Sequence, residues 1–232
     1  MKTGTKTKVT LLAATAVIAF SGVAYSVAAD TQPIELNFFS HLDAGMPEQD
    51  VFIARSDAVV YRVTADDKDL QTRLFATAEE LHHNPFDPKQ VGPHEKGADL
   101  GLNLGEWLAA KGSGTYECEG ERGVIDVTFA GLIPDGVYTM WHFFMPMPVI
   151  DPFIGTLDLP YGARDGSEAT FAADGQGTAS FAKTTESCLQ LSGSQTVAGL
   201  AIAYHSDGNT YGAVPGEFGK NAHIQLFTML PN

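Results

Sequence analysis

Hydrophobic and polar positions alternate with a two-residue period in the second half of the chain. Over residues 123–130, Ile125, Val127 and Phe129 alternate with polar neighbours, which is typical of a strand with one buried face. Residues 136–144 are apolar at nearly every position, as expected of a central strand that is covered on both faces. Further strands are predicted at 169–173, 178–182, 197–205 and 223–230.

Turn residues separate these strands, and helical periodicity is nearly absent. Asp174-Gly175-Gln176-Gly177 is a hairpin signal between the strands at 169–173 and 178–182. Short strands with Gly, Pro and Asp between them predict a mainly β fold, an antiparallel β-sandwich of Greek-key type, similar to immunoglobulin or cupredoxin domains.

Residues 30–112 have a mixed pattern. Extended segments are predicted at 34–39 and 58–64, and helices are predicted to start at Thr77 and to run over 104–111, with Gly112 as the helix-ending residue. The apolar positions are too few for a separate core. We therefore expect residues 30–112 to be an N-terminal extension packed on a β-sandwich domain at 113–232.

The first 29 residues have the pattern of a secretory signal peptide. A lysine-containing start precedes an apolar run over residues 9–20, and Val27-Ala28-Ala29 is a small-residue cleavage site. About twenty apolar residues would be needed to span a membrane. The pattern predicts an exported protein, periplasmic or extracellular, that begins near Asp30 and has no membrane span.

Acidic residues outnumber basic ones by 28 to 14. Without the three lysines of the leader, 11 basic and 28 acidic residues remain, a formal charge of −17. A surface of this charge repels nucleic acid and anionic lipid, so neither is an expected partner. The partner class, whether small ligand, metal ion or protein, stays open.

Only two cysteines are present, Cys118 and Cys188. In an oxidising compartment an isolated even pair favours one disulfide. A metal-thiolate site would normally bring a second cysteine two residues away or a nearby histidine cluster, and neither cysteine has one.

His205 ends one predicted strand and His223 begins the next. If the two strands pair antiparallel, both imidazoles lie at one end of the sheet, where they could ligate a metal ion. The alternative is that each histidine caps its strand and bonds the loop backbone.

The loop between these histidines is long for a strand connection and rich in glycine. Its functional interpretation is a ligand-binding loop that uses Asp207, Tyr211, Glu217 and Phe218. The structural alternative is a compact loop packed on its own aromatic side chains.

A second metal hypothesis rests on His142 and Met145, because imidazole and thioether donors suit copper. The alternative is a buried histidine whose hydrogen bonds are satisfied, with methionine filling gaps in the core.

No motif of nucleotide binding, zinc proteases, α/β-hydrolases or EF-hand calcium sites occurs. An enzyme with a site assembled from distant residues, a hydrolase or an oxidoreductase, remains open.

Two segments carry a resemblance, residues 131–141 (GLIPDGVYTMW) and 203–212 (AYHSDGNTYG). They are similar to stretches of exported bacterial β-sandwich proteins of uncharacterised function, and the similarity covers about the last 120 residues. It implies a sandwich fold and export, and it implies no activity. The leading expectation is an exported binding or structural module, with a periplasmic copper-binding protein as the alternative.

Overall fold

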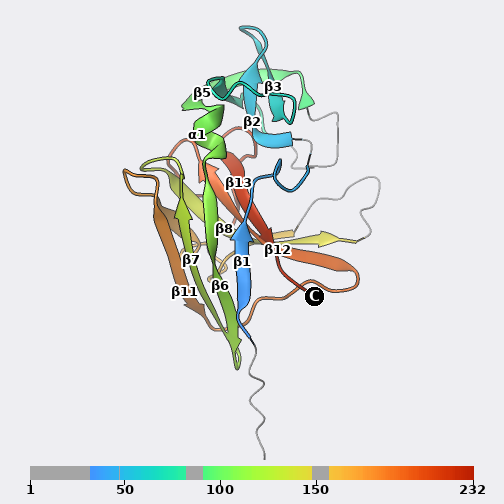
Figure 1. Ribbon diagram of the computed structural model, residues 1–232, viewed down its shortest axis with the longest axis vertical. Helices are drawn as coiled ribbons and strands as arrows, with labels where there is room; N and C mark the ends of the chain where they lie inside the picture. The colour runs from blue at the N-terminus through green and yellow to red at the C-terminus, as the bar shows by residue number, and fades with distance from the viewer. Residues whose placement is uncertain (1–31, 47, 82–90, 148–156) are drawn as a thin grey trace, which may run out of the picture. The chain divides into compact units, whose positions relative to one another are not determined.

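The computed structural model describes residues 32–46, 48–81, 91–147 and 157–232. The leader and its cleavage site therefore lie outside the described residues. Contacts group Thr31–Asn232 into one unit. The regular secondary structure of this unit is almost entirely antiparallel strands, which confirms the mainly β prediction (Figure 1). The one helix of the described ranges has five residues, so nothing helical there could cross a bilayer.

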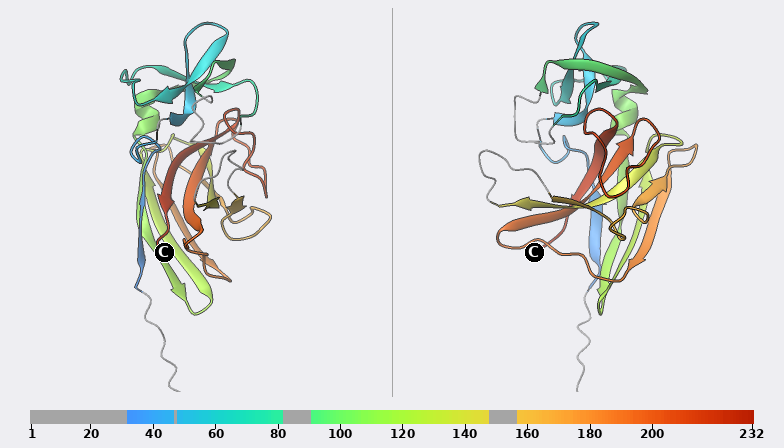
Figure 2. Two further views of the ribbon diagram at one scale, coloured as in Figure 1. Left: turned by 90° about the vertical axis from the view of Figure 1, so that its right-hand side faces the viewer. Right: turned by 180° about the vertical axis from the view of Figure 1, so that it is seen from behind.

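Two sheets form a β-sandwich, as predicted. The first has the strand order β1-β6-β7-β11 and the second β10-β8-β12-β13, with β9 also paired to β8. Figure 2 shows the two sheets edge-on in its left view. The strands are β1 (Ile34–Phe38), β6 (Lys111–Glu119), β7 (Arg122–Ala130), β8 (Val137–Pro146), β9 (Leu157–Pro160), β10 (Thr170–Ala172), β11 (Ala179–Thr185), β12 (Thr196–His205) and β13 (Ala222–Met229).

The alternating residues of the facing strands fill the core between the sheets. Val127 and Phe129 of β7 are completely buried in one cluster with Leu200 and Ile202 of β12. We call the side of the β8-β12-β13 sheet that carries this cluster its inner face. A smaller cluster that includes Trp141 covers the outer face.

Four strands that sequence reasoning largely missed form a closed barrel in the order β2-β3-β5-β4. They are β2 (Glu48–Ala54), β3 (Val59–Thr64), β4 (Arg73–Thr77) and β5 (His94–Asn103). β5 lacks apolar alternation, and the pairing of β2 with β3 and of β4 with β5 is irregular in register. Only β3 was predicted, because its Val and Tyr residues carry the β signal.

The expected boundary between an extension and a sandwich at 112/113 falls inside β6. β1, which belongs to the expected extension, pairs with β6 along its whole length, for example Leu36 with Gly114. The sandwich is therefore built from both sides of that boundary, and the part that belongs to neither of its sheets is the barrel of β2, β3, β4 and β5. Pairing of β1 across about eighty residues has no local signal in the sequence.

The predicted helix at 104–111 is shorter than expected. α1 (Leu104–Leu108) begins with a capping box in which Asn103 and Glu106 exchange hydrogen bonds. Gly112 was expected to end the helix but instead lies in β6 opposite Phe129, where a Cβ atom would come within 2.5 Å of the phenyl ring. Close packing, and not a left-handed turn, requires glycine there.

The helix predicted to start at Thr77 is wrong over the described residues. Thr77 ends β4, and its N–H donates to the Gly219 carbonyl at 2.7 Å. The N–H of Ala78 donates to Glu95, also distant in sequence. Long-range partners have replaced the local bonds that a helix would make.

The turn at 174–177 forms as predicted, but it joins two sheets and not the two strands of a hairpin. Gly177 donates to Asp174 at 2.9 Å in a tight turn, and φ of Gly177 is +71°. β10 then pairs with β8 whereas β11 pairs with β7. The turn chemistry is local, whereas the choice of partner strand depends on the rest of the fold.

Asp50, the acidic member of a buried ion pair within the barrel, links the barrel to the sandwich. Asp50 of β2 accepts from Nη1 of Arg62 at 2.7 Å, and the two side chains are 0% and 5% exposed. The second carboxylate oxygen of Asp50 accepts from the N–H of Ile224 in β13 at 2.9 Å. Nearby, Trp107 Nε1 donates to Gln49 at 3.1 Å. Asp50 therefore connects its own strand, β2, both to β3 and to the distant β13.

The predicted disulfide between Cys118 and Cys188 is present, and the two cysteines are 70 positions apart in sequence. It joins the end of β6 to the segment that follows β11. The described residues contain no free cysteine.

Candidate functional site

β12 and β13 pair antiparallel, so His205 and His223 lie at the same end of the sheet, as the sequence indicated. The register places His223 opposite Tyr204, and His205 opposite Ala222. Because neighbouring residues of a strand point to opposite faces, the His205 side chain lies on the outer face and the His223 side chain on the inner face. The two imidazoles do not converge on one point.

His205 is engaged by its neighbours on β8. Its Nε2 lies 2.8 Å from the Thr139 hydroxyl, which also accepts from Trp141 Nε1 at 2.6 Å. Its Nδ1 is buried and has no hydrogen-bond partner among the described residues. Burial lowers the pKa of His205 to about 4, although the charge of Asp207 opposes this decrease.

The loop after His205 is held together by its own side chains. The hydroxyl of Tyr211 donates to the carboxylate of Asp207 and accepts from Asn221 Nδ2 at 2.7 Å. This bond to Asp207 raises the pKa of Tyr211 to about 12. Asn221 also accepts from the N–H of Glu217 at 2.8 Å. These contacts support the compact-loop interpretation.

Two other contacts anchor the same loop. Glu217 pairs with Lys220 at 2.8 Å. Phe218 packs on the outer-face cluster, and its carbonyl accepts from Leu81 at 2.9 Å. The structure therefore brings the residues of the predicted ligand loop together, and their side chains bond to one another or pack on the outer-face cluster.

His142 and Met145 are not brought together either. The unbroken register of β8 with β12 places these two residues on opposite faces of the strand. The ring of His142 packs against Phe144 with centroids 4.3 Å apart. Over the described ranges, no group of three or more His, Cys, Asp or Glu side chains could hold a metal ion.

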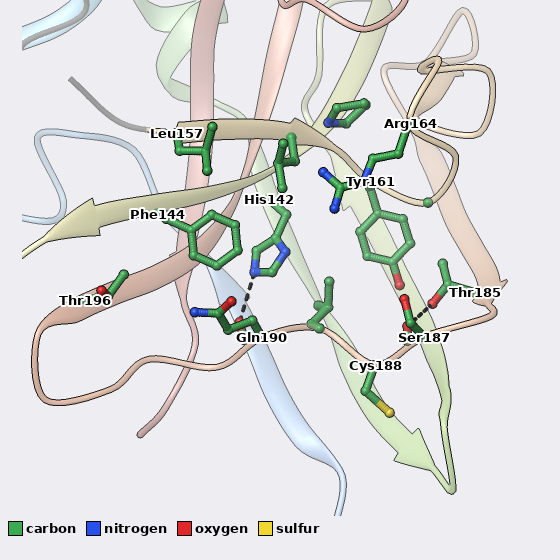
Figure 3. A pocket seen from close by; sticks show the side chains of 14 residues that line it. His142, Phe144, Leu157, Tyr161, Arg164, Thr185, Ser187, Cys188, Gln190 and Thr196 are labelled. Atoms are coloured by element: carbon green, nitrogen blue, oxygen red, sulfur yellow. Dashed lines mark hydrogen bonds between the residues drawn. The ribbon is translucent and has the colours of Figure 1, made fainter.

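A pocket of about 500 Å³ lies beside His142 (Figure 3). Its walls come from β8, β9 and the segments 160–164 and 185–190. Phe144, Leu157, Leu159 and Leu189 give it apolar surface. Its volume is within the usual range for small-molecule sites. We call it the β8–β9 pocket.

His142 is fixed in one tautomer at the pocket wall. Its Nε2 lies 3.0 Å from the Gln190 carbonyl. Because a carbonyl can only accept, Nε2 carries the proton and Nδ1 is left with a lone pair. Burial lowers the pKa of His142 to about 4, and the positive charge of Arg164 adds to this decrease. The imidazole is therefore neutral at neutral pH.

Two polar groups of the β8–β9 pocket are only weakly engaged by the described residues. Tyr161 is 1% exposed, and its hydroxyl makes no hydrogen bond of ordinary geometry within the described part of the chain. Burial, with a smaller effect of Tyr116, raises the pKa of this phenol, and the Thr185 side chain opposes part of the increase. Arg164 forms no ion pair with a carboxylate of the described residues, and Figure 3 shows its guanidinium group directed toward the pocket.

The pocket's charge is opposite to that of the chain. None of the described residues that line it is acidic, and Arg164 is its one permanent cation. Sequence reasoning missed the pocket because its residues come from segments without a shared motif. The one available signal was Arg164, a rare cation in an acidic chain.

The buried histidines predict a loss of stability in mild acid. Unfolded histidines bind protons below about pH 6.5, whereas folded His142 and His205 do so only near pH 4. Between these values the unfolded state binds more protons, so the free energy of unfolding falls as the pH is lowered. Urea unfolding at a series of pH values measures this decrease.

His205→Gln is the matched variant, because its side-chain amide can either donate to the Thr139 hydroxyl or accept from it. We expect a shallower decrease between pH 6.5 and 4 than in the unmodified protein. If the free energy of unfolding depends on pH in the same way in both proteins, His205 does not contribute to the loss of stability in acid.

Comparison of the chain with protein-family models gives no match, and comparison with curated proteins gives none either.

Proposed function

We propose that this protein is an exported binding module that takes a small amphipathic anion into the β8–β9 pocket. The observation that carries the proposal is the composition of the pocket wall. Among the described residues, this lining joins apolar side chains to an arginine without a carboxylate partner and includes no acidic residue, in a chain with 28 acidic residues.

The geometry favours a ligand with two ends. Phe144 and Leu159 offer apolar surface to a ring or a short hydrocarbon chain. Arg164 suits a carboxylate or sulfonate, which guanidinium groups bind through paired hydrogen bonds. The buried Tyr161 hydroxyl and the neutral His142 add two neutral polar groups. Acidic residues elsewhere on the surface would repel such an anion, so Arg164 gives the pocket its selectivity.

Export is supported by the leader pattern and by the disulfide, which is typical of proteins in oxidising compartments. The weakly engaged polar groups and the pocket favour a binding module over a purely structural one. The metal alternative has no comparable support, since the proposed donors are on opposite faces.

The test is binding of 8-anilinonaphthalene-1-sulfonate, an aromatic anion whose fluorescence increases in apolar sites. Arg164→Gln is expected to weaken binding roughly fivefold to tenfold, the equivalent of about 1 kcal/mol. Decanoate, a flexible carboxylate, should displace the dye from the unmodified protein.

The matched control is Arg122→Gln, which removes an arginine with a 66% exposed side chain at the first position of β7, outside the pocket. It should bind the dye like the unmodified protein. If both substitutions weaken dye binding equally, the effect comes from the overall charge of the protein and not from the pocket, which contradicts the proposal. Unchanged dye affinity in Arg164→Gln would also overturn it.

A further inference from the structure

Ser206 and His223 form a hydrogen-bonded pair at the end of the sheet, away from the β8–β9 pocket. Ser206 follows the last residue of β12, and His223 is the second residue of β13. The serine Oγ lies 3.1 Å from Nε2 of the imidazole. A hydroxyl within this distance of a ring nitrogen has the geometry of a nucleophile with its general base.

The positions of the protons follow from the other ring nitrogen. Nδ1 of His223 lies 2.9 Å from the backbone carbonyl of Asp50, which can only accept, so Nδ1 carries the proton. Burial lowers the pKa of His223 and keeps the ring neutral. Nε2 therefore has a free lone pair, and the Ser206 hydroxyl donates to it.

The surroundings hold this pair in place. The Asp50 carboxylate is fixed by Arg62 and by the N–H of Ile224, so the carbonyl that orients the imidazole belongs to a rigid residue. The N–H of Ser206 donates to the Asn221 carbonyl at 3.0 Å. His223 is completely buried whereas Ser206 is partly exposed. A reactant could therefore reach the hydroxyl while the base stays shielded from water.

We propose that Ser206 is a nucleophile for acyl transfer from neutral esters, with His223 as its general base and the Asp50 carbonyl as the orienting group. Oγ attacks the ester carbonyl carbon while its proton passes to Nε2. The bond to the leaving oxygen breaks, and Nε2 returns the proton to that oxygen to release the alcohol. Water, deprotonated by Nε2, then cleaves the acyl-serine to give the acid and restore Ser206.

The substrate class follows from charge. Asp207 is adjacent to Ser206, and the carboxylate of Asp50 lies close to His223. Arg62 neutralises the charge of Asp50, so Asp207 leaves the surroundings of Ser206 net negative, which disfavours phosphate esters and favours uncharged acyl esters. This inference is independent of the β8–β9 pocket, so either proposal can fail without the other.

The experiment uses p-nitrophenyl acetate with the full chain. We expect p-nitrophenol release to fall at least about tenfold in Ser206→Ala. Peptide mass spectrometry after an acid quench should find acetyl on the peptide that contains Ser206. Ser167→Ala is the matched control, because Ser167 is an exposed serine bonded to Asp165 and not to a histidine.

A second variant tests the base directly. Ser206→Cys would add one thiol to a chain in which the described residues have no free cysteine. The rate of its alkylation by iodoacetamide against pH should give a thiol pKa below the usual value of about 8.5, because the cysteine proton passes to His223. Ser180→Cys, on an exposed position of β11, should give the usual value.

An unchanged rate in Ser206→Ala, or acetylation spread over lysines without Ser206, would overturn the proposal. A thiol pKa near the usual value in Ser206→Cys would overturn the role of His223 as the general base.

Discussion

Replacing Asp50 with asparagine is expected to destabilise the protein by about 3–5 kcal/mol, because the substitution leaves the charge of Arg62 buried without its carboxylate. Asparagine has nearly the same volume, so the effect isolates the charge. It also replaces an ionised acceptor of the Ile224 N–H by a neutral one.

Urea unfolding followed by tryptophan fluorescence measures the effect, since Trp107 and Trp141 are 1% and 2% exposed and should report loss of the core. The matched control is Asp99→Asn. Asp99 pairs with Arg73 at the same 2.7 Å, but the two side chains are 39% and 67% exposed. Its expected cost is below about 1 kcal/mol. Similar losses in the two variants would show that burial of the Asp50 pair has no special energetic effect.

Removing the disulfide should destabilise the protein by about 4 kcal/mol. The bond closes a loop between residues 70 apart, and a loop of this length strongly restricts the unfolded chain. We expect the same lowering of the urea midpoint in two samples. One is the double variant Cys118→Ala and Cys188→Ala, and the other is the unmodified protein in dithiothreitol.

Dithiothreitol should not change the double variant further, which separates loss of the bond from other effects of the reductant. Unfolded, unreduced protein should contain no titratable thiol. Two thiols per chain, or an unchanged midpoint after reduction, would contradict a stabilising disulfide.

The strands that sequence analysis located were those with a strong local signal. Alternation of Ile125, Val127 and Phe129 fixed the two faces of β7, and these three side chains are buried as predicted. Glycine and aspartate at 174–177 formed the expected turn. β2 and β5 were missed because neither has a two-residue period: β2 is three polar residues followed by a continuous apolar run, and β5 has few apolar residues.

The candidate sites show how a strand register decides chemistry. The sequence placed His205 and His223 at one end of one sheet, which is correct. Shifting the pairing by one residue would bring both imidazoles to the same face. The observed register separates them, and it leaves His223 beside Ser206 and the Asp50 carbonyl.

By itself, then, the sequence determined the mainly β class, the central strands and the pairing of Cys118 with Cys188, because periodicity, turn chemistry and a single cysteine pair are local or unambiguous properties. Only the tertiary structure decided the partner of β1, the sheet of β10 and the lining of the β8–β9 pocket. Each of these depends on contacts between residues far apart in the chain. The free energy of such contacts depends on how the whole core packs, so no single segment carries a sequence pattern that predicts them.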